Sequence, residues 1–346
     1  MSAAESSTRD LLARDRKAEH IQIALERSVQ LESRYFDEWA FEHVALPEMA
    51  ADEIDTEVDF LGKRLSAPLL VSCMTGGTEA AARINRHLAE AAEKAGVAMG
   101  VGSQRKALED PGQVDSFRVR DVAPTVPVLA NLGAVQLNYG YGFDECQAAV
   151  DMIGADALVF HLNVLQEALQ PEGQTDFRGL LDGMAAVAER LDVPVAVKEV
   201  GCGLSGAVGR ALVERGITIL DTAGLGGTSW ARIEARRSGD VELGEMFADW
   251  GIPTPESIRQ LADIDGATVI GSGGLRSGLD AAKAIGLGAA MAAMAYPFLE
   301  PATESAEAVG RKIGRIVEEL RISMLCVGAR DVTELQAAKL VKRSMP

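Results

Sequence analysis

Residues 127–160 read PVLANLGAVQLNYGYGFDECQAAVDMIGADALVF and contain the pattern on which the fold depends. Two short apolar runs, PVLAN and DALVF, stand on either side of DECQAAVDMIGA, a segment with helical periodicity. Neither run alternates apolar with polar residues, which is typical of strands that are buried on both faces of a parallel sheet. The stretch therefore predicts a strand, a helix and a second, parallel strand.

The same alternation extends over most of the chain. Further apolar runs of this kind begin at Pro68, Val97, Pro194, Ile217, Ala267 and Ala289, with Ala-rich helical segments between them. Eight such repeats predict an α/β fold, a (β/α)₈ TIM barrel whose active face lies at the carboxyl ends of the strands. An open, doubly wound sheet is the alternative, but no GxGxxG follows the first strand. We expect the barrel to span 66–346, after a polar, partly helical N-terminal arm over 1–65.

Composition excludes several classes of function. The chain has 346 residues, 47% of them hydrophobic, with 51 acidic against 34 basic residues and a formal net charge of -17. This charge opposes binding to nucleic acid or to an anionic membrane, so we expect neither partner. Cysteines are scattered without a CxxC pair, which argues against a zinc site or a disulfide framework. No signal-like or membrane-spanning apolar run is present, so we expect a cytoplasmic protein.

Polar side chains follow several of the predicted strands. The fourth strand runs into HLNVLQEALQPEG (161–173), where Asn163, Gln166, Glu167 and Gln170 would share one face of a short helix. Taken alone, this segment could be an amphipathic surface helix. Other strands end in MTGGT (74–78), GSQR (102–105), NLGA (131–134) and VKEVG (197–201). Because these ends share one rim of a barrel, we expect a ligand site there.

Glycine-rich loops at the same rim predict contacts to a phosphate. GSGG (271–274) follows the seventh strand and precedes a helix that begins near Ser277, and AMAYP (293–297) ends the eighth strand. A helix N-terminus with nearby backbone N–H groups is a common anion site, so we expect phosphate at this position. The long connection 224–249 contains GGTSW, which could wrap a flavin or form a loop without a ligand.

These motifs together resemble the type 2 isopentenyl diphosphate isomerases, an FMN-dependent family. The segments that carry the resemblance are RKAEH (16–20), MTGG (74–77), GSQR (102–105), NLGA (131–134), HLNVLQEALQPEG (161–173), VKEVG (197–201), DTAGLGGTSWARIEARR (221–237) and GSGGLRSG (271–278). HLNVLQEALQPEG together with GGTSWARIE is highly specific, whereas GSGG is shared by many flavin barrels. The departures, Cys73 and Gln174 among them, are minor.

The resemblance implies roles for individual residues. The implied FMN contacts are Met74, Thr75, Ser103, Asn131, Lys198, Thr228, Gly273, Gly274 and Ala295. The implied substrate shell is Arg16, Lys17, Arg105, His161, Asn163 and Gln166, with Glu167 as the magnesium ligand. One carboxylate is enough because Mg²⁺ keeps several waters and binds diphosphate oxygens.

The implied reaction interconverts isopentenyl and dimethylallyl diphosphate by adding one proton and removing another, in isoprenoid biosynthesis. No pair of side chains in the sequence obviously suits both steps, and the resemblance implies that reduced FMN is the acid–base cofactor, with NADPH as its reductant. It also implies a homo-oligomer, a tetramer or an octamer, and an arm that folds over the site of its own or a neighbouring subunit. The alternative is a related reduced-FMN enzyme that isomerises or cyclises a larger prenyl substrate.

Three other functions are compatible with an FMN-type or phosphate-binding barrel. A 2-hydroxy acid oxidase needs a histidine base late in the chain, and the last of the four histidines is His161. An enzyme like inosine monophosphate dehydrogenase needs a cysteine in a mobile loop, and the 224–249 connection has none. A catalytically silent barrel is harder to reconcile with the complete 161–173 motif.

Overall fold

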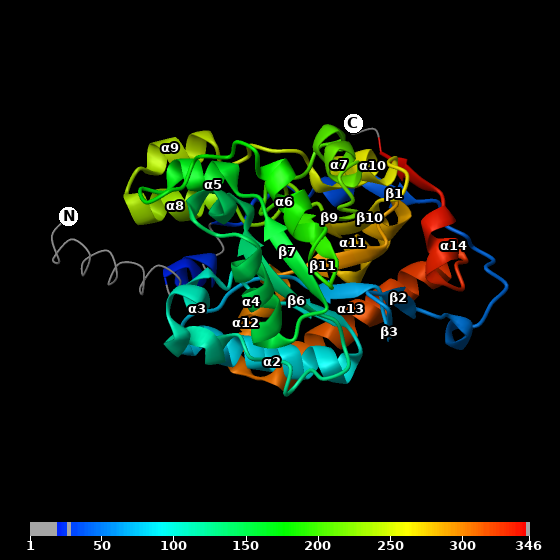
Figure 1. The fold of residues 1–346 in the computed structure, drawn as a ribbon. Helices are drawn as coiled ribbons and strands as arrows, with labels where there is room; N and C mark the ends of the chain where they lie inside the picture. The colour runs from blue at the N-terminus through cyan, green and yellow to red at the C-terminus, as the bar shows by residue number, and fades with distance from the viewer. Residues whose placement is uncertain (1–18, 26–28, 344–346) are drawn as a thin grey trace, which may run out of the picture.

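The protein is a closed barrel of eight parallel strands surrounded by helices (Figure 1). The computed structural model describes residues 19–25 and 29–343. The strands, in chain order, are β4 (Leu69–Val71), β5 (Ala98–Gly100), β6 (Val128–Gly133), β7 (Ala157–His161), β8 (Val195–Lys198), β9 (Ile219–Asp221), β10 (Thr268–Ser272) and β11 (Met291–Met294). They pair in that order, and β11 closes on β4, which confirms the predicted (β/α)₈ TIM barrel.

The helices outside the barrel follow the predicted alternation. They are α2 (Glu79–Ala95), α3 (Arg105–Glu109), α4 (Phe143–Ile153), α5 (Val164–Leu169), α6 (Leu180–Ala188), α7 (Gly206–Val213), α8 (Trp230–Ser238), α9 (Val241–Met246), α10 (Thr254–Ala262), α11 (Gly278–Gly286), α12 (Tyr296–Glu304), α13 (Ala306–Val327) and α14 (Val332–Ala337). The long 224–249 connection contains α8 and α9, and α12 and α13 follow the eighth barrel strand.

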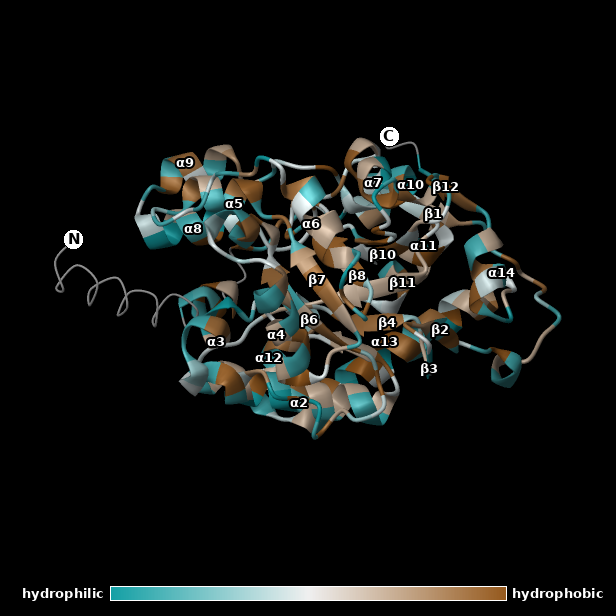
Figure 2. Ribbon diagram, viewed as in Figure 1, coloured by the Kyte–Doolittle hydropathy of each residue, from teal (hydrophilic) through white to brown (hydrophobic). Residues whose placement is uncertain are grey.

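Local sequence explains where these helices begin and end. The hydroxyl of Thr78 accepts a hydrogen bond from the Ala81 N–H and caps α2, which ends at Gly96 in the left-handed conformation. In the same way, the side chain of Ser305 caps the start of α13, which ends at Gly328 in the left-handed conformation. The apolar strands lie in the centre of the ribbon, and the polar faces of the helices lie outside (Figure 2). This arrangement fits strands buried on both faces.

A hairpin closes the amino-terminal end of the barrel. Strands β2 (Val58–Phe60) and β3 (Lys63–Leu65) pair with each other, and Phe60 and Leu65 pack on the inward-facing side chains of the barrel strands. Residues 58–65 had been expected in a separate arm. Instead they bury apolar side chains in the barrel interior, because this end of a closed barrel must be covered.

Another short strand within 1–65 pairs with a strand near residue 341, close to the last described residues. Strand β1 (Trp39–Phe41), which follows the 3₁₀ helix η2 (Tyr35–Glu38), pairs antiparallel with β12 (Leu340–Lys342). The described part of 1–65 therefore contains short strands as well as the helix over 19–25. No helix in the described part of the chain is both long and apolar enough to cross a membrane.

Candidate active site

A cavity of about 290 Å³ lies at the carboxyl ends of the barrel strands. Two other cavities near this rim have volumes of about 10 Å³ each. The large cavity is lined by every predicted site residue that the structure describes: Met74, Thr75, Ser103, Arg105, Asn131, His161, Asn163, Gln166, Glu167, Lys198, Thr228, Gly273, Gly274 and Ala295. Arg16 and Lys17 lie outside the described residues. The strand ends thus converge as the barrel predicts.

The polar face of α5 points into the protein. Glu167 is buried, whereas the apolar Val164 is 55% exposed. An amphipathic surface helix would show the opposite arrangement, so that alternative is wrong. One carboxylate oxygen of Glu167 accepts hydrogen bonds from Gln170 Nε2 (2.5 Å) and from the Gln174 N–H (2.6 Å), and the other accepts from Asn163 Nδ2 (2.9 Å). Amide donors therefore hold this carboxylate in place at the cavity wall.

Asn163 offers a second oxygen beside that carboxylate. Its Nδ2 donates to both Glu167 and Gln166, so the amide cannot be turned round without placing its oxygen against two acceptors. The Oδ1 atom is buried and has no hydrogen-bond partner among the described residues. Carboxylate and amide oxygens are ligands that Mg²⁺ prefers. The described residues contain no cluster of three metal-binding side chains, so a cation here would need further oxygens from a ligand or water.

Buried charges surround Lys198 at the end of β8. Its Nζ donates to the Glu199 carbonyl oxygen at 2.5 Å, and Asp221 is its partner in the β8–β9 ladder. Burial raises the pKa of Asp221, against the opposing effect of the Lys198 charge and of hydrogen bonds from Ser272 and the Ala223 N–H. Burial also raises the pKa of the Cys73 thiol to about 11, although Lys198 lowers it. The site therefore contains a desolvated ammonium among acidic groups.

Asn131 links two neighbouring strand ends. Its Oδ1 lies 2.9 Å from His161 Nδ1. An amide oxygen only accepts, so this contact requires the proton on Nδ1 and leaves Nε2 as an acceptor in the neutral ring. The backbone of Asn131 is fixed by Gln104, whose side-chain oxygen accepts its N–H at 3.0 Å. The arrangement can orient His161 toward a bound ligand.

The start of α11, which was predicted together with GSGG (271–274) to bind a phosphate, is capped by carboxylates of the protein itself. The N–H groups of Arg276 and Ser277 at the start of α11 donate to the carboxylate of Asp280, and the Gly278 N–H donates to Glu319. Carboxylates of the protein therefore already accept these three N–H groups at the start of α11. By contrast, the N–H groups of Gly273 and Gly274 donate to no other described residue.

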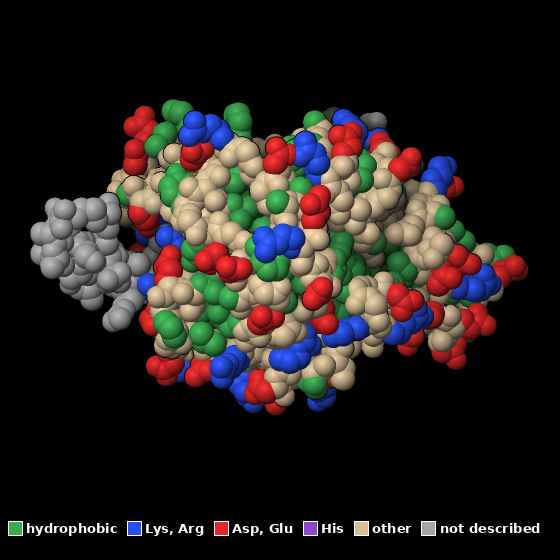
Figure 3. Space-filling model, in the orientation of Figure 1, with side chains coloured by type: hydrophobic (Ala, Val, Ile, Leu, Met, Phe, Trp, Pro, Cys, Tyr) green, Lys and Arg blue, Asp and Glu red, His purple; other side chains and the backbone are tan. Residues whose placement is uncertain are grey.

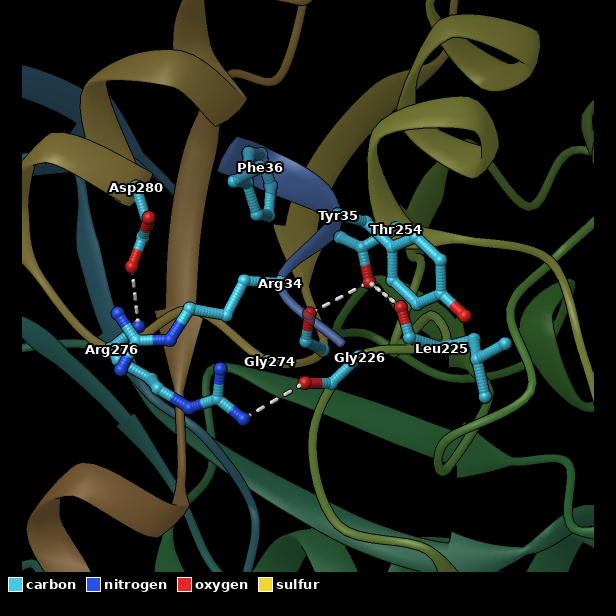
Figure 4. Close-up of a pocket in the computed structure, with 10 residues that line it drawn as sticks. Arg34, Tyr35, Phe36, Leu225, Gly226, Thr254, Gly274, Arg276 and Asp280 are labelled. Carbon is cyan, nitrogen blue, oxygen red and sulfur yellow. Dashed lines mark hydrogen bonds between the residues drawn. The ribbon is translucent and has the colours of Figure 1, made fainter. Parts of the chain in front are cut away.

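The glycines of this loop are explained by packing. At Gly274, where φ is +77°, a Cβ would lie 2.3 Å from the Gly226 carbonyl oxygen. Arg276 donates to the same carbonyl (3.2 Å) and to that of Leu31 (2.8 Å), beside Tyr35 and Arg34 (Figure 4). An anion at this end of the cavity would meet two backbone N–H groups and one guanidinium, which is a suitable donor set for a phosphate.

The segment around residue 30 covers the same end of the cavity. Gln30 Nε2 donates to Thr228 Oγ1 at 2.7 Å. The Leu31 N–H donates to the Gly227 carbonyl oxygen, and the Ser229 N–H donates to that of Val29. The described helix over 19–25 contributes His20, Ile21 and Ala24 to the cavity wall. This part of the expected arm therefore covers the site of its own subunit.

Glu234 of α8 connects the helix over 19–25 to α5. It is fully buried, its Oε1 lies 3.1 Å from His20 Nε2 and accepts from Gln166 Nε2 at 3.0 Å, and its Oε2 accepts from Arg237 at 2.5 Å. Burial on its own would raise the pKa of Glu234, but these partners outweigh it, so the pKa is lowered. The charged form of Glu234 thus ties the arm to the polar face of α5.

Comparison with known proteins identifies the family. The model of the FMN-dependent dehydrogenases matches residues 19–116 and 251–342. An isopentenyl-diphosphate delta-isomerase from Synechococcus sp. is 51% identical over 93% of this chain and 94% of its own length. The enzyme of that name from Stutzerimonas stutzeri is 48% identical over 95% and 97%. The chain belongs to the FMN-dependent, type 2 isopentenyl-diphosphate delta-isomerase family.

Solved structures of oxidases resemble this chain in fold. A mandelate oxidase with a monooxide FMN adduct has a TM-score of 0.64 and covers 94% of this chain and 92% of its own, at 18% identity. A lactate oxidase from Pediococcus acidilactici has a TM-score of 0.66, covers 90% of this chain and 85% of its own, and is 14% identical. At such identities these structures show the fold alone. A 2-hydroxy acid oxidase needs a histidine base late in the chain, whereas the last histidine of this chain, His161, lies at the end of β7.

Several residues at the site of this isomerase-family protein were missed as contacts in the sequence. They are His20, Gln30, Gln136, Trp230, Arg276 and Tyr296, all of which line the cavity. Arg276 directly follows GSGGL and could have been found from that position. Gln30 had no signal, because only the folded chain brings it to Thr228.

Proposed function

We propose that this chain interconverts isopentenyl and dimethylallyl diphosphate with reduced FMN as acid–base cofactor. The observation that carries the proposal is identity of about one half, over nearly the whole chain, to proteins named isopentenyl-diphosphate delta-isomerase. The convergence of the family's motifs on one cavity supports it. When bound, reduced FMN would supply the acid–base chemistry at the alkene, and NADPH would be the reductant that prepares it.

The cofactor end of the cavity has suitable donors. Lys198 would place a cation beside the pyrimidine edge of the flavin, and Asn131, Thr75, Ser103 and Thr228 would offer amide and hydroxyl groups. Met74 and Ala295 would pack on the ring system. At the other end, the N–H groups of Gly273 and Gly274 would receive the phosphate. The whole protein carries a net charge of -17, so such local donors are needed to hold an anion.

The substrate end would hold a diphosphate and a magnesium ion. Glu167 would bind the metal, because its carboxylate is fixed at the wall and lies next to the free oxygen of Asn163. Arg105, His161 and Gln166 would contact the substrate, together with Arg16 and Lys17 of the arm. Holding the substrate among fixed polar groups and away from water would favour proton transfer over side reactions.

We also infer a cytoplasmic homo-oligomer, a tetramer or an octamer. Apolar side chains of α9 that are 38–67% exposed, Val241, Leu243 and Met246, support a contact between subunits. Hydrophobic atoms gather over α9 on the face shown in Figure 3, on a surface that otherwise mixes both signs of charge. Light scattering of the purified protein would measure the number of subunits.

An anaerobic assay tests the proposed reaction. FMN is reduced with dithionite, NADPH is omitted, and isopentenyl diphosphate and Mg²⁺ are added. Dimethylallyl diphosphate should then form over many turnovers, with deuterium uptake from D₂O. The same assay with longer prenyl diphosphates tests the alternative substrate class. Turnover with oxidised flavin, or, in a parallel assay with NADPH in place of dithionite, one NADPH consumed per product, would contradict the proposal and indicate an oxidoreductase.

A further inference from the structure

A buried carboxylate next to Lys198 has no part in the proposed reaction. Glu199 follows Lys198 at the end of β8 and is only 7% exposed. Its Oε2 accepts hydrogen bonds from the N–H groups of four successive residues: Val200 (2.6 Å), Gly201 (2.6 Å), Cys202 and Gly203 (3.3 Å). Successive N–H groups that converge on one anion form a nest, and here the anion belongs to the chain itself.

The turn built around this carboxylate is part of the cavity wall. Val200 and Gly201 line the cavity. On its outer side the turn is fixed by a hydrogen bond from the Ile252 N–H to the Cys202 carbonyl (2.8 Å). At Gly203, where φ is +79°, a Cβ would lie 2.9 Å from the Ile252 carbonyl oxygen. The turn therefore has one tightly constrained conformation, and Glu199 determines its inner side.

Burying this carboxylate is costly. Burial raises the pKa of Glu199, even though the three nearest N–H groups and the Lys198 charge lower it. A neutral polar side chain could close a turn at lower desolvation cost. Perturbed buried carboxyls of this kind concentrate at functional sites. The geometry connects it to function through one atom, the Glu199 carbonyl oxygen, which accepts the hydrogen bond from Lys198 Nζ at 2.5 Å.

We propose that Glu199 is a positioning residue for Lys198. Its carboxylate gathers the N–H groups of residues 200–203 and so fixes the backbone from which the Glu199 carbonyl oxygen points at the Lys198 ammonium. A lysine side chain has four rotatable bonds and loses rotamer entropy when it is held in one place. The fixed carbonyl oxygen removes much of that freedom before any ligand arrives. The inference rests on the proposed contact between Lys198 and the flavin.

A double-mutant cycle on FMN affinity tests this coupling. Glu199→Gln keeps the shape of the side chain but removes its charge, and Lys198→Met removes the ammonium. We expect Glu199→Gln to weaken FMN binding about tenfold in the presence of Lys198 and less than twofold in the Lys198→Met background, because coupled residues are not additive. Equal losses in both backgrounds, or no loss in either, would show that Glu199 only supports the fold and would overturn the proposal.

A second measurement does not depend on the folding of a Glu199 variant. Amide hydrogen exchange of residues 200–203 is compared between the unmutated protein and Lys198→Met, both without FMN. Coupling is reciprocal, so loss of the ammonium should speed exchange in this turn about tenfold. Unchanged protection would overturn the proposal. If instead FMN affinity is the same with and without Lys198, the cofactor placement fails, and hydrogen exchange still decides whether Glu199 and Lys198 are coupled.

Asp156→Asn serves as the matched control. Asp156 is a partly buried carboxylate at the opposite end of the barrel, where it is held by Lys63 (2.6 Å) and Arg120 (2.7 Å). Its removal should destabilise the protein and leave FMN affinity unchanged. A weaker FMN affinity in this control would mean that global stability, and not Lys198, transmits the effect of Glu199→Gln.

Discussion

Buried carboxyl groups at the two ends of the barrel strands have opposite pKa shifts. At the amino-terminal end, Asp156 is paired with Lys63 of the hairpin and with Arg120, and it also accepts the Val128 N–H at 2.8 Å. Burial on its own would raise the pKa of Asp156, but these partners outweigh it and the pKa is lowered. At the carboxyl ends of β8 and β9, burial prevails and raises the pKa of Glu199 and Asp221, whereas Glu234 on α8 is held by partners that lower its pKa.

This difference separates stability from function within one fold. A carboxyl group whose pKa is lowered by folding stabilises the folded state when it is charged, whereas one whose pKa is raised destabilises it. The amino-terminal end therefore gains stability from its ion pairs. The carboxyl end retains costly desolvated groups, which is the pattern expected where a ligand must be held. Substitutions at the two ends should accordingly affect different measurements.

The largest effect is expected at Glu167, at the carboxyl end. Glu167→Gln should lower kcat about 100-fold and weaken the dependence of the rate on Mg²⁺, because it removes the charge of the proposed metal ligand. FMN should remain bound. Initial rates measured over a magnesium titration check this expectation, with the exposed Glu189→Gln as a control for loss of one negative charge. An unaltered magnesium titration curve would remove Glu167 from the metal site.

The barrel could be predicted from the sequence because its strands are buried on both faces and form eight apolar runs without alternation, separated by helical segments. The site residues on strand ends could be predicted as well, since topology alone brings Asn131, His161 and Lys198 to one rim. Contacts made by the arm, such as Gln30 with Thr228, depend on tertiary packing and left no periodic signal. The hairpin over 58–65 was missed because its short strands are charged on their outer side.

The next effect concerns stability at the amino-terminal end. Asp156→Asn should lower the free energy of unfolding by about 2 kcal/mol, since Lys63 and Arg120 lose their partner but are partly exposed. Activity and FMN affinity should not change. Denaturant unfolding near neutral pH measures the loss.

The pH dependence of stability sharpens the same test. The pKa of Asp156 is lowered in the folded state. Its contribution to the free energy of unfolding is therefore fully present at a pH above the pKa that this carboxyl has in the unfolded chain, and it is lost as pH falls through the pKa in the folded state. The difference in unfolding free energy between Asp156→Asn and the unmutated protein should therefore shrink in acid. A difference that stays constant across this range would show that the ion pairs do not carry the stability.

A smaller effect is expected where the arm meets the cofactor end. Gln30→Ala removes the hydrogen bond to Thr228 and should weaken FMN binding about threefold, in keeping with the net value of one hydrogen bond. Gln147→Ala removes an exposed hydrogen bond to Asp151 and provides the control. Fluorescence titration with FMN measures both variants. Equal affinities in the two variants would mean that the segment around residue 30 covers the cavity without stabilising the bound cofactor.

The smallest effect is a change in thiol reactivity at the carboxyl end. Because the pKa of Cys73 is about 11, only about 1 in 1,000 of its thiols is ionised at pH 8, and alkylation should be slow. The Lys198 charge lowers this pKa and the Asp221 charge raises it, so Lys198→Met should slow alkylation at Cys73 and Asp221→Asn should speed it. Mass spectrometry of the FMN-free protein over a pH series gives the rates.

Cys146, whose pKa burial raises to about 12, lies in α4 away from these charges and is the internal control. If neither substitution changes the rate at Cys73 relative to Cys146, the charges at this end are screened by water. The contrast between the two ends would then reflect burial alone and not the interaction of desolvated charges.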